Sequence, residues 1–171
     1  MMKYLLFLLC YTTIHIAYSQ TRLNRPEVKV SNTTYLCDFS LPNKIIVSNT
    51  TNQGFNWSEV SDGCKIHYDY TTVAPLAKDV FSQRRISEIG RESLSRFYIL
   101  VNEKSKVEEI QFVVPRSTKI YAEEILALEN ELKKLTFPDY DEQVVSLEEL
   151  GCEVNSYLLV TFTLIVNKLN E

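Results

Sequence analysis

The sequence predicts an α+β protein in which an antiparallel sheet carries one long amphipathic helix and is preceded by a β-rich N-terminal segment. Three patterns lead to this expectation: short β-prone runs separated by turn residues, a hairpin followed by a helical stripe, and a long apolar run near the C-terminus. The 171 residues are 45% hydrophobic and 23% charged, which is typical of a globular chain. We therefore expect one compact domain over residues 20–171.

Residues 1–19 have the order of a secretory signal peptide. Lys3 supplies a positive charge, an apolar stretch follows to about Ile16, and Ala17-Tyr18-Ser19 places small residues at a cleavage site before Gln20. An uncleaved membrane anchor is the alternative, but polar residues interrupt the stretch and it is short for a span. We expect an exported protein, periplasmic or secreted, with no transmembrane span after cleavage.

Cleavage before Gln20 removes Lys3 and His15, which changes the net charge from −4 to −5 and leaves His67 as the single histidine. A net negative chain has no global attraction to nucleic acid. A multi-histidine metal site is excluded, and no nucleotide-binding, zinc-protease or esterase motif occurs. We therefore assign no catalytic, cofactor-binding or metal-ligating residue and expect no cofactor.

Three cysteines remain after cleavage: Cys37, Cys64 and Cys152. An odd number in an exported protein fits one bridge with a free thiol, no bridge, or an intermolecular bridge. We predict a Cys37–Cys64 disulfide, because both lie in the Asn- and Thr-rich half that most needs a covalent link; closing that loop would stabilise by roughly 3–4 kcal/mol. Cys152 is expected to be buried or unpaired.

Residues 20–95 are predicted to form the β-rich N-terminal segment, with a short helix or irregular stretch from Pro75 to about Ser95. β-prone runs separated by turn residues occur at Val28–Val30, Thr34–Phe39 and Lys44–Val47. Asn-x-Ser/Thr triplets begin at Asn32, Asn49 and Asn56. They are glycan acceptors in a eukaryotic secreted protein and polar loop residues in a bacterial one.

Residues 64–71 alternate in polarity, as in a half-buried strand. Ile66, Tyr68 and Tyr70 share one face, and Lys65, His67 and Asp69 share the other. Solvent exposure accounts for the polar face. The alternative interpretation is a functional site that consists of His67 and Asp69.

The hairpin pattern opens the C-terminal half, residues 96–171, which reads as strand, strand, helix, strand. Phe97–Val101 and Val107–Val114 are β-prone, and the polar turn Asn102–Lys106 separates them. Pro115 ends the second strand, because proline cannot donate to a ladder.

The amphipathic helix is expected from Ser117 or Thr118 to about Leu135, followed by Phe137-Pro138. Its apolar stripe consists of Tyr121, Ile125, Leu128, Leu132 and Leu135. An acidic loop is expected from Asp139 to Glu149. Tyr157–Val166 is too short for a membrane helix and is typical of a central buried strand.

From Phe97 to Val166 this order resembles the C-terminal domain of the TonB-type energy-transducer family of Gram-negative bacteria. The matching segments are Val101–Ile110, Leu132–Leu135 with Phe137-Pro138, and Val160–Thr163. Ser105 stands where that family usually has glycine in the hairpin turn. The resemblance implies an antiparallel sheet packed on one helix and a protein partner bound by strand addition. More generally, the chain resembles small exported proteins of Gram-negative bacteria.

Two functional hypotheses follow from the sequence. The first is an exported, non-catalytic binding or assembly module of the cell envelope. The second is a small hydrolase that uses His67 or a pair of carboxylates, such as Glu108 with Glu109 or Glu123 with Glu124. Asp139-Tyr140-Asp141-Glu142 could also offer oxygen ligands to Ca²⁺, but it lacks the glycine and spacing of a known loop.

Overall fold

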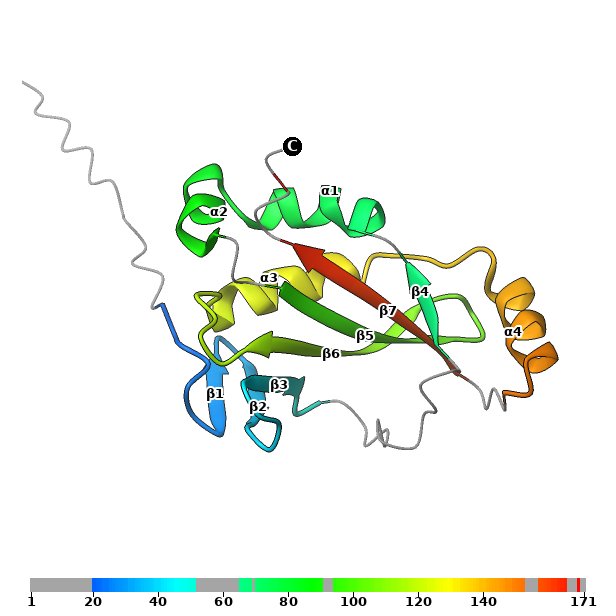
Figure 1. Ribbon diagram of the computed structural model, residues 1–171, viewed down its shortest axis with the longest axis horizontal. Helices are drawn as coiled ribbons and strands as arrows, with labels where there is room; N and C mark the ends of the chain where they lie inside the picture. Colours follow the sequence, from blue (N-terminus) through cyan, green and yellow to red (C-terminus); the bar gives the residue numbers. More distant parts are fainter. Residues whose placement is uncertain are drawn as a thin grey trace, which may run out of the picture.

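A computed structural model gives the fold of the chain (Figure 1). The structure describes residues 20–51, 65–68, 70–90, 94–152, 157–165 and 169. The predicted signal peptide, Asn56, Cys64 and Asp69 therefore lie outside the described residues. Within them the chain is α+β, as predicted, with a seven-stranded, mostly antiparallel sheet and four helices. None of the described helices is long and apolar enough to cross a membrane.

The strands of the sheet lie in the order β1-β2-β3-β6-β5-β7-β4. Their bounds are β1 Glu27–Val30, β2 Thr33–Asp38, β3 Lys44–Asn49, β4 Ile66–Tyr68, β5 Leu94–Asn102, β6 Val107–Pro115 and β7 Tyr157–Ile165. Neighbours are antiparallel, except that β4 runs parallel to β7. The predicted hairpin is β5 and β6, the predicted final strand is β7, and the three N-terminal strands extend the sheet beyond β6.

One face of this sheet is apolar across its whole width. The register places Cys37, Val47, Phe112, Phe97 and Phe162 in one row across five strands. All five side chains are buried. Alternation along each strand puts every second residue on this face, which is why the β-prone runs read as alternating or fully apolar in the sequence.

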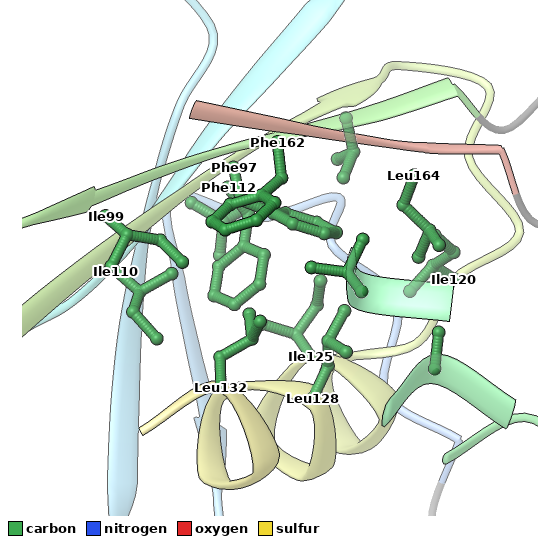
Figure 2. Close-up of a cluster of buried hydrophobic side chains, with 14 of the residues drawn as sticks. Phe97, Ile99, Ile110, Phe112, Ile120, Ile125, Leu128, Leu132, Phe162 and Leu164 are labelled. Atoms are coloured by element: carbon green, nitrogen blue, oxygen red, sulfur yellow. The ribbon is translucent and has the colours of Figure 1, made fainter. Parts of the chain in front are cut away.

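The helices are α1 Tyr70–Val80, α2 Gln83–Ile89, α3 Ala122–Leu132 and α4 Tyr140–Glu149. Helix α3 packs on the apolar face of the sheet. Figure 2 shows Ile125, Leu128 and Leu132 of α3 pointing toward Phe97, Phe112 and Phe162 of the sheet. These leucines are no more than 1% exposed, so the predicted packing of the helical stripe against the sheet is confirmed.

Helix α3 is shorter than predicted at both ends because other segments compete for its terminal residues. At the start, Tyr121 pairs with Arg22 in a β-bridge, and Ala122 N–H donates to the carbonyl of Thr21. At the end, Thr136 pairs with Lys106, and the neighbouring residues dock on the hairpin turn. Tertiary pairing therefore replaces the first and last helical turns that the apolar stripe predicts.

The acidic segment predicted as a loop is helix α4. Tyr140, Val144 and Leu147 lie on one side of it and face the core. This four-and-three spacing is that of an amphipathic helix. Asp141 and Glu142 in its first turn suit the helix dipole. Because acidic residues surround this short stripe, the sequence pattern resembles a loop.

The predicted strand over residues 64–71 is also shorter than expected. Strand β4 covers only Ile66–Tyr68, and α1 already begins at Tyr70. The apolar residues of α1 that face the core, Val73, Ala74 and Ala77, recur at helical spacing. Tyr70 therefore belongs to a helix rather than to the alternating strand face.

The turn between β5 and β6 contains a residue in the left-handed region. Ser105 has φ = 60°, and its N–H donates to the carbonyl of Asn102. Three loop residues ending in a left-handed residue are a common hairpin turn, for which glycine is the usual choice. The serine that departs from the transducer family pattern therefore occupies a position that favours glycine.

Candidate functional site

His67, the single histidine after the predicted cleavage, lies on edge strand β4 with an exposed side chain. Its Nδ1 is 2.5 Å from the hydroxyl oxygen of Thr161 on β7. Asp69, its proposed partner, lies outside the described residues. No carboxylate or cysteine is bonded to His67 in the described part of the chain. The hydrogen bond to Thr161 therefore joins β4 to β7 and gives the imidazole a structural role.

The candidate carboxylate pairs are held in separate contacts. Glu123 accepts from the backbone N–H and hydroxyl of Thr21, whereas Glu124 binds the guanidinium of Arg85 at 2.6 Å. Glu108 is bonded to the side chain of Asn102. The described residues contain no group of three or more His, Cys, Asp or Glu placed to hold a metal ion.

Asp139 does not lie in a calcium loop. It precedes α4, and its carboxylate accepts from the phenol of Tyr68 at 3.2 Å and from the amide of Gln143 at 3.1 Å. Burial of Tyr68, together with the Asp139 carboxylate, raises the pKa of that phenol. The acidic run therefore anchors α4 to strand β4.

The predicted Cys37–Cys64 disulfide is not formed at Cys37. Its thiol is free, 4% exposed and directed from β2 into the core face of the sheet. Burial raises the pKa of this thiol to about 11. Cys64 lies outside the described residues. Cys152 is buried, as expected, and its sulfur takes part in a disulfide.

A buried polar network joins β2, β3 and α3. Glu129 of α3 is 1% exposed, and its carboxylate accepts from the phenol of Tyr35 at 2.5 Å and from the amide of Asn49 at 3.1 Å. Lys133 completes the network with an ion pair at 2.7 Å. A buried carboxylate is tolerated only when it is paired and hydrogen-bonded, and these three groups meet that need.

The network includes Asn49, the first residue of one of the three Asn-x-Ser/Thr triplets. The Asn49 amide donates to Glu129, and its oxygen accepts from the backbone N–H and hydroxyl of Thr51. Asn49 is therefore a structural side chain in the folded protein, whereas Asn32 lies exposed in the turn between β1 and β2.

Arg85 is the centre of a second polar cluster, at the start of α3. Its guanidinium binds Glu124 and Glu88, donates to the carbonyl of Lys119, and lies 4.6 Å from the ring centre of Tyr121. The hydrogen bonds to Glu124 raise the pKa of Arg85. A cavity of about 380 Å³ lies beside this cluster, but the charge of Arg85 is already neutralised there.

Strand β1 forms one end of the sheet, and its backbone groups can be assigned a direction. Cys37 N–H donates to the carbonyl of Pro26, so residues 26 and 37 are a hydrogen-bonded pair. Bonded and non-bonded pairs alternate in an antiparallel ladder. Glu27 and Lys29 therefore point their N–H and C=O groups away from β2, and no described residue hydrogen-bonds to these outward groups.

A cavity of about 510 Å³ lies between β1 and the segment that precedes it. Arg22 and Arg25 line it from that segment, and Glu27 and Lys29 line it from β1. None of the three cations has an ion-pair partner among the described residues, although Arg22 lies 5.9 Å from the ring centre of Tyr121. We call this space the β1 cavity. It brings three unneutralised cations beside outward-facing backbone groups.

The sequence interpretation missed both the network and the β1 cavity. Glu129 follows the apolar Leu128 directly, so it reads as an ordinary solvated acid on a polar helix face. The only signal at β1 was the set of three basic residues, Arg22, Arg25 and Lys29, within eight positions of a net negative chain. Their common direction depends on the chain reversal before Glu27, which sequence spacing does not reveal.

Comparisons with known proteins define the fold rather than the function. No protein-family model matches the chain. No curated protein matches it either. Among solved structures, the chain is similar to a DUF5043 family protein from Bacteroides uniformis, with a TM-score of 0.53, 15% sequence identity and 85% of each chain covered. At this identity the similarity shows a shared α+β fold.

Proposed function

We propose that the protein is an exported, non-catalytic binding module of the cell envelope that takes up an extended segment of a protein partner along strand β1. One observation supports this proposal above all. Glu27 and Lys29, whose N–H and C=O groups point away from β2, both line a cavity of about 510 Å³. Strand addition uses such main-chain groups for affinity. The cavity volume lies within the usual range of about 300–1,000 Å³ for binding pockets.

The surroundings of β1 favour a short, specific partner segment. Exposed sheet edges are usually protected from uncontrolled pairing by charges, prolines and short length. Strand β1 has all three features, since it has four residues, follows Pro26 and exposes Glu27 and Lys29. A partner that matches this edge forms only a few ladder hydrogen bonds, so its side chains must supply the rest of the affinity.

Strand β7 and the hairpin of β5 and β6 are consistent with the resemblance to the transducer family, for which strand addition is the implied mode of binding. That family relationship is a proposal. The order β5, β6, α3 and β7 is the order that the resemblance implies, with α4 inserted between α3 and β7, whereas β1, β2 and β3 add an edge that the resemblance does not include.

Strand addition at β1 can be tested with two substitutions of the first strand residue. A phage-displayed library of random hexapeptides would be selected for binding to the chain from Gln20 onward. The affinity of the selected peptides would then be measured for the variants Glu27→Pro and Glu27→Gln. Proline is tolerated at the first position of an edge strand but removes the outward N–H. The expected result is weaker binding to Glu27→Pro alone. Equal binding to both variants would reject strand addition.

Export is a separate part of the proposal and has its own test. N-terminal sequencing of the protein recovered from the periplasm or medium should begin at Gln20. Recovered material that still begins at Met1 would reject cleavage and leave the anchor as the explanation of residues 1–19.

A further inference from the structure

The β1 cavity is positively charged within a protein that is negatively charged overall. Its lining residues include three cations, Arg22, Arg25 and Lys29, and one anion, Glu27. The whole chain has 18 basic and 22 acidic residues. The local sign is therefore opposite to the sign of the net charge, and the cavity favours anions although the chain as a whole is negative.

The three cations of the β1 cavity differ from the basic residues of the helices that form ion pairs. Arg84 and Arg85 bind Glu88, Lys133 binds Glu129, and Lys134 binds Glu131. Arg22, Arg25 and Lys29 have no such carboxylate among the residues that the structure describes. Their charges are available to a ligand without breaking an existing ion pair.

Two kinds of group therefore meet in one cavity. The cations recognise carboxylates or other anions, whereas the outward backbone groups of Glu27 and Lys29 offer both a donor and an acceptor from each residue. A small inorganic anion uses the donors but leaves the outward carbonyls without partners. An extended peptide uses both, because each of its ladder residues also presents one N–H and one C=O.

We infer that the partner segment is acidic: an extended peptide with carboxylate side chains that pairs with β1 and is held by Arg25, Lys29 and Arg22. This inference rests on the proposed strand addition and adds the charge of the partner. The side chains of Glu27 and Lys29 point to the same side of β1, away from the core face. A carboxylate of the added strand that lies opposite Lys29 on that side is favoured, whereas one opposite Glu27 is disfavoured.

The test measures the binding of three labelled hexapeptides in which valine alternates with glutamate, serine or lysine. Fluorescence polarisation gives the dissociation constant of each for the chain from Gln20 onward. The glutamate peptide should bind at least tenfold more tightly than the lysine peptide, and its affinity should fall as the ionic strength rises from about 0.05 to about 0.5 M.

Variants separate the charge of the cavity from its backbone groups. The double variant Arg25→Gln/Lys29→Gln should weaken the glutamate peptide roughly tenfold, which is about three- to fivefold for each exposed ion pair. Lys78→Gln, which removes an exposed cation from α1, is the matched control and should change nothing. Glu27→Gln should strengthen binding slightly, whereas Glu27→Pro should weaken it.

The outcomes distinguish the two proposals. Equal binding of the glutamate and serine peptides, both lost in Glu27→Pro, would overturn the acidic partner and leave strand addition intact. Binding of the glutamate peptide that is unchanged in Glu27→Pro but displaced by inorganic tripolyphosphate would show a general anion site and overturn both. No binding of any of the three peptides would also overturn both.

Discussion

The phenol of Tyr35 on β2 donates a 2.5 Å hydrogen bond to the carboxylate of Glu129 on α3, at a position where both side chains are buried. The two residues are 94 positions apart in the sequence. This contact fixes the N-terminal strands to the helix of the C-terminal half. It therefore holds β1, the neighbour of β2, in a fixed position relative to the rest of the fold.

Replacing Tyr35 with phenylalanine should destabilise the protein by roughly 1.5–3 kcal/mol, the range for a hydrogen bond to a charged group. The carboxylate of Glu129 keeps Asn49 and Lys133 but loses its strongest neutral donor. Urea denaturation of both proteins measures the difference in the free energy of unfolding. A change below about 0.5 kcal/mol, the scatter of ordinary surface substitutions, would contradict a stabilising network.

The same contact predicts a loss of stability at alkaline pH. Burial, together with the charge and hydrogen bond of Glu129, raises the pKa of Tyr35 above its ordinary value of 10.0. The folded state therefore keeps a proton that the unfolded chain releases above that pH. The contribution is complete below pH 10.0 and falls as the pH rises further. Tyr35→Phe should show a shallower decline in the free energy of unfolding from pH 9 to 11; an equally steep decline would assign it to other groups.

Truncation of the core stripe should cost far more than truncation of an exposed leucine. Leu128→Ala removes a side chain that is 1% exposed, so we expect a loss of roughly 2–5 kcal/mol. Leu150→Ala is the matched control, because Leu150 is 76% exposed. Thermal and urea unfolding would measure both variants. Similar small losses in the two would mean that α3 does not pack on the sheet.

Replacing the turn residue Ser105 with glycine should stabilise the protein. Its φ of 60° lies in the left-handed region, which glycine adopts without the steric penalty of a side chain. Ser105→Gly is expected to raise the free energy of unfolding by up to about 1 kcal/mol, and Ser105→Val to lower it. The two substitutions should move the urea midpoint in opposite directions, and a shift in the same direction would contradict this turn geometry.

Peptide mapping under non-reducing conditions would show which cysteines form disulfides and which are free thiols. Cys37 is free, and Cys152 is in a disulfide. Cys37 should resist alkylation until the protein is unfolded, since its pKa of about 11 leaves little thiolate at neutral pH. A peptide that links Cys37 to Cys64 would restore the pairing predicted from the sequence.

Most of the strands could be predicted because alternation and turn residues are local signals. Val28–Val30, Val107–Val114 and Tyr157–Val166 all form strands close to the expected bounds. The apolar stripe predicted which residues of α3 face the sheet. Its length was overestimated because Arg22 and Lys106 pair with the residues just outside the helix, and sequence spacing contains no information about such distant partners.

The features that support function were hidden for the same reason. Glu129 resembles any solvated glutamate until Tyr35 and Asn49 are brought against it by the sheet. The direction of the backbone groups of Glu27 depends on which pairs of the β1–β2 ladder are hydrogen-bonded, and the cavity depends on how the chain turns before Pro26. These are properties of register and chain path, whereas His67 and the adjacent carboxylates stand out in the sequence by residue type alone.

Amide hydrogen exchange at β1 tests the central claim most directly, because it reports on the outward groups themselves. With the glutamate–valine hexapeptide at saturation, the amides of Glu27 and Lys29 should exchange at least roughly tenfold more slowly than in the free protein. The amide of Val28, already paired with β2, should change much less. Unchanged exchange at Glu27 and Lys29 in the presence of bound peptide would contradict strand addition at β1.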